Sequence, residues 1–130
     1  MGAISADQVS DALNNADIVL HVESFKKNEK MKTRLSFSTK IVDCLASGWC
    51  VMDIGWHEAA SIDYFIQNDA ALVAFDEKSI AEQLKKVVEN PDLLNEYAQK
   101  AWECGKRNHQ IEDIQHNLYK DIYSLVNKDL

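Results

Sequence analysis

The alternation of two apolar patterns limits the fold of this 130-residue chain more than any other feature. Three short runs, at residues 17–22, 50–54 and 70–75, are almost continuously apolar. Between them lie segments whose apolar residues recur at helical spacing. Continuous apolar runs are typical of strands that are buried on both faces of a parallel sheet and joined by helices. We therefore predict an α/β fold with a Rossmann-like, three-layer arrangement: about three parallel strands, flanking helices and a helical C-terminus.

Helical spacing predicts six helices, over residues 6–14, 38–47, 62–68, 78–89, 91–105 and 111–126. Gly48 suits the left-handed conformation that ends the second of them. In that helix the expected buried face is Ile41, Val42, Leu45 and Ala46. Aromatic residues of the last two helices are expected to pack in the same way: Tyr97, Trp102 and Tyr119. Residues 23–37 are charged and show no period, which indicates a long loop.

Composition indicates one soluble domain over residues 1–130, because 46% of the residues are apolar and 27% are charged. The net charge of −7 repels phosphate backbones and argues against general binding of nucleic acid. Three cysteines without CxxC spacing favour the reducing cytoplasm and argue against a disulfide framework or a zinc site. No run reaches the roughly 20 apolar residues of a membrane span. Nothing indicates a cofactor or a bound metal.

Residues 26–40 reverse the charge of this acidic chain, with six basic side chains and one acidic residue, Glu29. They lead into residues 37–48, which read as a loop entering a helix. Cations beside free amide groups suit an anionic ligand such as a diphosphate. The simpler interpretation is a solvated loop, with Lys40 and Asp43 as a surface ion pair at i, i+3 spacing. The sequence leaves both interpretations open.

The run Ser38-Thr39-Lys40-Ile41-Val42-Asp43-Cys44-Leu45-Ala46-Ser47-Gly48-Trp49-Cys50-Val51 resembles the donor-binding helix of group-1 glycosyltransferases with GT-B architecture. Those enzymes pair two Rossmann-like domains. Phe37 matches the phenylalanine of the turn before the helix, and Asp43 falls on a glutamate. Residues 46–51 match Ala-x-Gly-x-Pro-Val, with Cys50 in place of proline. The resemblance covers only the second half of the family's C-terminal domain, so residues 1–130 are expected to be a partial nucleotide-sugar-binding domain.

The resemblance implies a set of substrate-binding residues: Phe37, Ser38, Thr39, Lys40 and Asp43. Asp43 corresponds to the residue that hydrogen-bonds the ribose hydroxyls, and Ser38 to Lys40 lie near the departing diphosphate. The family's other glutamate falls at Leu35. Further candidates from the sequence are Glu23, Arg34, His57 and Glu58. His21 is expected to be a buried residue at a strand end, and no catalytic residue is assigned.

The implied partner is a nucleoside-diphosphate sugar, together with an N-terminal acceptor domain that has no counterpart in these residues. The chain alone is therefore expected to be inactive and its parent to be a glycosyltransferase. The alternative is a non-catalytic Rossmann-like module that binds another protein. In either case the strand at residues 18–22 is expected to have an uncovered edge, which predicts a homodimer or a capping N-terminal segment.

Overall fold

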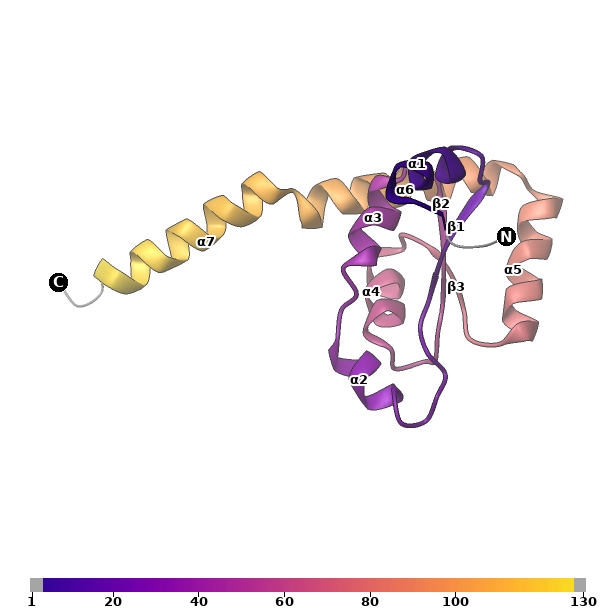
Figure 1. Cartoon of the computed structure of the whole chain (residues 1–130), viewed down its shortest axis with the longest axis horizontal. Helices are drawn as coiled ribbons and strands as arrows, with labels where there is room; N and C mark the ends of the chain where they lie inside the picture. The colour runs from indigo at the N-terminus through magenta and orange to yellow at the C-terminus, as the bar shows by residue number, and fades with distance from the viewer. Residues whose placement is uncertain (1–3, 128–130) are drawn as a thin grey trace.

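The computed structural model describes residues 4–127, so three residues at each end of the predicted domain lie outside it. Its strands are β1 (Ile18–Val22), β2 (Cys50–Ile54) and β3 (Leu72–Ala74). Its helices are α1 (Ala6–Asn14), α2 (Lys30–Leu35), α3 (Lys40–Ala46), α4 (Ala60–Asn68), α5 (Glu77–Glu89), α6 (Asp92–His109) and α7 (Ile111–Val126). Strands and helices alternate along most of the chain (Figure 1).

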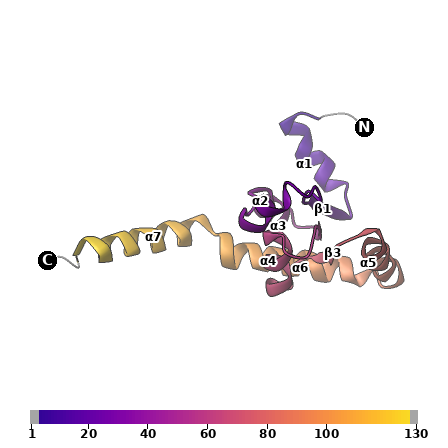
Figure 2. The same cartoon turned by 90° about the horizontal axis from the view of Figure 1, so that it is seen from below.

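The three strands form one parallel sheet in the order β1-β2-β3. Helices α3 and α4 cover one face and α5 covers the other (Figure 1). Helix α6 lies near the amino ends of the strands (Figure 1) and runs across the sheet from the α5 side to the α4 side (Figure 2). Its two halves contribute to different cores. The predicted three-layer, Rossmann-like α/β fold is thus confirmed.

Two apolar cores lie on the two sides of the sheet. The core under α3 and α4 consists of Val19, Ile41, Cys44, Leu45, Val51, Phe65, Ala70, Ala71, Ala101 and Cys104. The core under α5 consists of Cys50, Met52, Leu72 and Val87. Alternate residues of β2 therefore enter opposite cores, as the pleat of a central strand requires. Gly48 follows α3 with a φ of +77°, which confirms its predicted conformation.

The prediction that the first strand is buried on both faces is wrong. Val19 and His21 are buried under α3, whereas the side chains that point the other way, Leu20 and Val22, are 57% and 59% exposed. α5 packs on β3 and leaves this end of the sheet uncovered. A continuous apolar run marks a strand, but it does not say how far the covering helices extend.

Three further expectations need correction. Residues 23–37 contain the short helix α2, which buries none of its side chains. Helix α6 continues through Gly105 to His109, because Gly105 allows close contact with α3: a Cβ at this position would lie 3.2 Å from Leu45 Cβ. In α3 the third buried side chain is Cys44, while Val42 and Ala46 are exposed.

Helix α7 points away from the rest of the domain (Figure 1). None of its residues is buried, and Tyr119, which was expected to pack, is exposed, as is Trp102 of α6. Its exposed apolar residues are Ile111, Ile114, Leu118, Ile122, Leu125 and Val126. Within residues 4–127, the helices are all too short or too polar to cross a membrane.

Candidate functional site

Three hollows adjoin one another along residues 32–43. The first, here called the β1–α3 cleft, has a volume of about 500 Å³ and lies between β1, α1 and α3. Its lining is Val9, Leu13, Val19, Leu20, His21, Val22, Glu23, Ser38, Lys40, Asp43 and Cys44. A second hollow shares Glu23 and Ser38 with it and is also lined by Thr33, Phe37 and Thr39. A third shares Phe37 with the second and is also lined by Arg34, His57, Glu58 and Tyr64. All the residues predicted from the sequence line at least one of the three.

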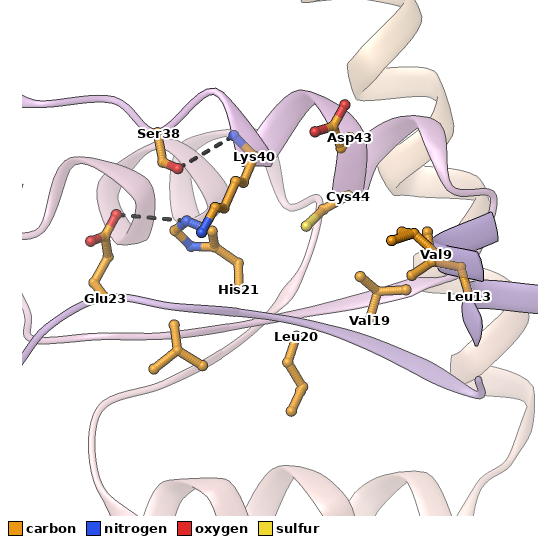
Figure 3. Close-up of a pocket in the computed structure, with 11 residues that line it drawn as sticks. Val9, Leu13, Val19, Leu20, His21, Glu23, Ser38, Lys40, Asp43 and Cys44 are labelled. Atoms are coloured by element: carbon orange, nitrogen blue, oxygen red, sulfur yellow. Dashed lines mark hydrogen bonds and ion pairs between the residues drawn. The ribbon is translucent and has the colours of Figure 1, made fainter. Parts of the chain in front are cut away.

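Glu23, Ser38 and Lys40 come together at one end of the β1–α3 cleft, although 17 positions separate Glu23 from Lys40 (Figure 3). Ser38 Oγ accepts a hydrogen bond from the backbone N–H of Lys40 at 3.3 Å. Burial raises the pKa of the Glu23 carboxyl, while the charges of His21 and Lys40 act in the opposite direction. This end of the cleft therefore holds a partly buried carboxylate and an exposed ammonium group, together with a hydroxyl.

The structure does not bring Asp43 into that group. Its carboxylate points away from His21 and Glu23 (Figure 3), and it also lines a hollow beside α1 with Ala6 and Asn14. Asp43 is one turn along α3 from Lys40. The two predicted charged residues of α3 therefore lie at different ends of the cleft.

Arg34, His57 and Glu58 lie at the opposite end of the three hollows. Arg34 Nε is 3.6 Å from Glu58 Oε2, and both side chains are more than half exposed. The ring of His57 stacks on Phe75 with centroids 4.0 Å apart. These three residues are therefore explained by ordinary surface contacts between neighbouring loops, one an exposed ion pair and the other a stacked ring.

Phe37 anchors the segment that joins α2 to α3. Its ring meets Tyr64 edge to face at 4.9 Å and stacks on His109 at 6.0 Å. The Tyr64 hydroxyl forms a hydrogen bond with His109 Nε2 at 2.8 Å and accepts another from Asn108 Nδ2 at 3.1 Å. This cluster fixes the position from which Ser38 and Lys40 enter the cleft.

Helix α3 contains seven residues and begins after Thr39, whose side chain makes no capping hydrogen bond. So short a helix has only a small dipole, because the dipole grows with the number of aligned peptide units. The favourable charge for an anion therefore comes mainly from the Lys40 side chain. Among residues 4–127, no three His, Cys, Asp or Glu side chains lie close enough together to hold a metal ion.

A buried ionisable pair at this end of the cleft was not expected to be part of the site. His21 Nδ1 donates to Asp53 Oδ1 at 2.7 Å, and His21 Nε2 is 3.7 Å from Glu23 Oε1. His21 is 5% exposed and Asp53 is fully buried. The sequence does contain a signal for the pair: each is the fourth residue of a five-residue apolar strand. Aligned parallel strands bring such positions side by side.

Comparison with known proteins gives one finding about the family. No curated protein and no solved structure matches the chain. The profile of a family described as glycosyl transferase-like matches residues 1–119, which includes both ends of the β1–α3 cleft. The match covers most of the chain and agrees with its Rossmann-like parallel sheet. The chain therefore belongs to the glycosyl transferase-like family.

Proposed function

We propose that this chain is the nucleotide-sugar-binding portion of a cytoplasmic glycosyltransferase with GT-B architecture, whose donor is a nucleoside-diphosphate sugar. Lys40 faces the diphosphate, and Ser38 and Thr39 supply hydroxyl donors beside it. Glycosyl transfer increases the negative charge on the departing diphosphate. A cation held at that position stabilises the transition state more than the bound donor.

One observation supports this assignment above all: Glu23, Ser38 and Lys40 meet in a single cleft beside a parallel sheet. Open α/β sheets commonly bind ligands near the carboxyl ends of their strands, where Glu23 follows β1. Leu35, at the position of the family's other glutamate, is 83% exposed on α2 and lines none of the three hollows. We therefore assign to Glu23 the contact with donor hydroxyls, and keep Asp43 as a candidate ribose ligand at the other end.

A second domain completes the proposed enzyme by binding the acceptor. The open cleft contains a place for a donor but no assigned catalytic group. The apolar residues of α7 offer a surface for such a domain, since none of them is buried against residues 4–127. On this basis the chain by itself is expected to bind donor without transferring sugar.

The test is calorimetric titration of the full chain with UDP, GDP and ADP and with the matching monophosphates. Lys40→Ala should weaken binding of the preferred diphosphate by roughly 10- to 100-fold, the effect of losing about 1.5–3 kcal/mol from one charge-assisted contact. The monophosphate should lose less, because the proposed partner of Lys40 is the diphosphate.

Lys78→Ala is the matched control, since Lys78 is 86% exposed on α5 and forms an exposed i, i+4 pair with Glu82. It should leave nucleotide binding unchanged. If none of the diphosphates binds, or if both lysine variants bind as tightly as the parent chain, the donor assignment is wrong. The alternative, a non-catalytic module that binds a protein, then becomes the better interpretation.

A further inference from the structure

Asp53 places an ionisable group inside an otherwise apolar strand. Its neighbours in β2 are Cys50, Val51, Met52 and Ile54. One carboxylate oxygen, Oδ1, accepts from His21, while the other, Oδ2, is buried without a hydrogen-bond partner among residues 4–127. Burying an incompletely paired carboxylate costs free energy, and two apolar side chains fill such a space at lower cost. Stability of the sheet therefore does not account for the pair.

Asp53, His21 and Glu23 form a row that leads from the core to the cleft. Nδ1 of the His21 ring is hydrogen-bonded to Asp53, so Nε2 is the ring nitrogen that faces the cleft. Nε2 lies 3.7 Å from Glu23 Oε1 (Figure 3). That separation is too long for a hydrogen bond, and the two groups form an ion pair when the imidazole is protonated. Exposure increases along the row, from the buried Asp53 to Glu23, which is 13% exposed.

The backbone of Glu23 is also held in place. Its N–H donates to the carbonyl of Ile54 at 2.8 Å, which continues the β1–β2 pairing past the end of the strand. Gly55 lies so close that a Cβ there would be 3.3 Å from Glu23 Cβ. The sheet therefore fixes the backbone and Cβ of Glu23. Only the outer torsions of its side chain are left for neighbouring groups to determine.

We propose that Asp53 and His21 are positioning residues that orient the Glu23 carboxylate to accept hydrogen bonds from a vicinal diol of the donor. The inference rests on the proposed function, because it concerns the same cleft. A carboxylate has two acceptor oxygens and can receive both hydroxyls of a diol. Lys40, on the open side of the cleft, remains assigned to the diphosphate. The row thus determines recognition of hydroxyl groups and leaves recognition of phosphate to Lys40.

Two substitutions of His21 separate this role from simple packing. The amide nitrogen of Asn reaches the position of Nδ1, and that of Gln reaches the position of Nε2. If His21 acts on Glu23, His21→Gln should retain diol recognition and His21→Asn should lose it. If His21 only satisfies Asp53, His21→Asn should be the milder change. Thermal unfolding of both variants shows how far each one disturbs the fold.

The ligands are the preferred diphosphate among UDP, GDP and ADP, its 2′,3′-dideoxy form and its glucose conjugate. In the parent chain, loss of a recognised ribose diol should weaken binding about tenfold. In His21→Asn that difference should disappear. If the diol is on the sugar, the parent should instead prefer the glucose conjugate over the diphosphate, and His21→Asn should lose that preference. Full discrimination by His21→Asn in both comparisons overturns the proposal.

Glu23→Gln provides a second variant at the mouth of the cleft, where folding is least at risk. It should lose the same diol discrimination as His21→Asn, and retention of that discrimination contradicts the proposal. An NMR titration of the Glu23 carboxyl without ligand gives a readout that does not need nucleotide binding. The groups that act on Glu23 are His21, Asp53 and Lys40. The Glu23 pKa should rise in His21→Asn and rise less in His21→Gln.

These measurements distinguish failure of the donor assignment from failure of the positioning role of His21. If no nucleotide binds but the Glu23 titration moves as expected, the donor assignment fails and the positioning of Glu23 stands. If nucleotide binds and depends on Lys40, but neither the diol comparison nor the Glu23 titration responds to His21, the positioning role fails and the donor assignment stands.

Discussion

His109 ends α6 with its ring against Phe37 and its Nε2 hydrogen-bonded to the Tyr64 hydroxyl. Burial disfavours the charged imidazolium and so lowers the pKa of His109 from its ordinary value of 6.5. The same surroundings raise the pKa of Tyr64 to about 12, mainly through burial. Both rings therefore remain uncharged near neutral pH, which suits an anchor for the segment entering the cleft.

His109 makes folding stability depend on pH in a definite direction. Between its lowered folded pKa and the unfolded value of about 6.5, the unfolded chain binds more protons than the folded chain. The contribution of His109 is thus fully present above pH 6.5 and is lost as the pH falls through the folded pKa. Urea unfolding at pH 7.5 and 5.5 should show a smaller loss of stability on acidification for His109→Gln than for the parent chain.

His116→Gln is the control for that measurement, because His116 is exposed on α7. It should behave like the parent chain at both pH values. Equal acid sensitivity in His109→Gln and the parent would assign the pH dependence to other groups.

The apolar period of the sequence located most of the helices and strands, including α7, which buries none of its residues. The bounds of α1, β2 and α7 agree with the prediction, and those of α5 differ by one residue. The pattern fails where tertiary contacts decide. α2 is a six-residue, largely charged segment with no apolar period to detect. Gly105 looked like a helix end, but a glycine also lets two helices approach closely, and this second role prevails here.

Gly105→Val tests the close contact between α6 and α3. The first atom of the new side chain would lie 3.2 Å from Leu45 Cβ, with the backbone of Leu45 at 3.8 Å. We expect the free energy of unfolding to fall by about 1–3 kcal/mol, the usual cost of overpacking. Chemical denaturation measures this value directly.

Asn95→Val is the matched control in the same helix. Asn95 is exposed, so the substitution adds a β-branched residue to α6 without a clash. Its effect should be within about 0.5 kcal/mol, as for most surface substitutions. If the two variants are destabilised equally, helix propensity rather than packing on α3 explains the Gly105 result.

Prediction of the candidate site was likewise limited to residues that lie close together in the sequence. The family resemblance predicted Ser38, Thr39 and Lys40 together, since they are neighbours in the chain. Glu23 was only one of several candidates, because its approach to Lys40 depends on how residues 24–37 fold back. The contact between His21 and Asp53 spans 32 positions. It depends on the register of two strands, and the shared fourth position of His21 and Asp53 identifies the pair only once that register is known.

The molecule as a whole leaves the β1 end of its sheet uncovered, whereas a closed domain covers both faces and edges of its sheet. Within residues 4–127, β1 pairs only with β2, and Leu20 and Val22 are more than half exposed. An edge strand with free backbone groups and exposed apolar side chains favours association with another chain. We therefore expect self-association through β1.

Light scattering should detect a homodimer of the full chain, and Leu20→Lys should convert it to a monomer by placing a charge on the exposed face of β1. Val88→Lys is the control, because Val88 is 79% exposed on α5, which packs on β3 at the other end of the sheet. It should leave the dimer intact. A parent chain that stays monomeric over the measured concentrations would contradict this expectation.

The pairing of His21 with Asp53 also has a consequence for how the sheet assembles. Their Cα atoms are direct partners across β1 and β2. A slip of one residue would turn one of the two side chains to the opposite face, since the side chains of a strand alternate. Asp53 would then be buried without the His21 N–H that it accepts from, at a cost that the apolar neighbours cannot offset. The buried pair thus selects one alignment of two otherwise interchangeable apolar strands, so that a correctly folded chain already has Glu23 at the mouth of the cleft.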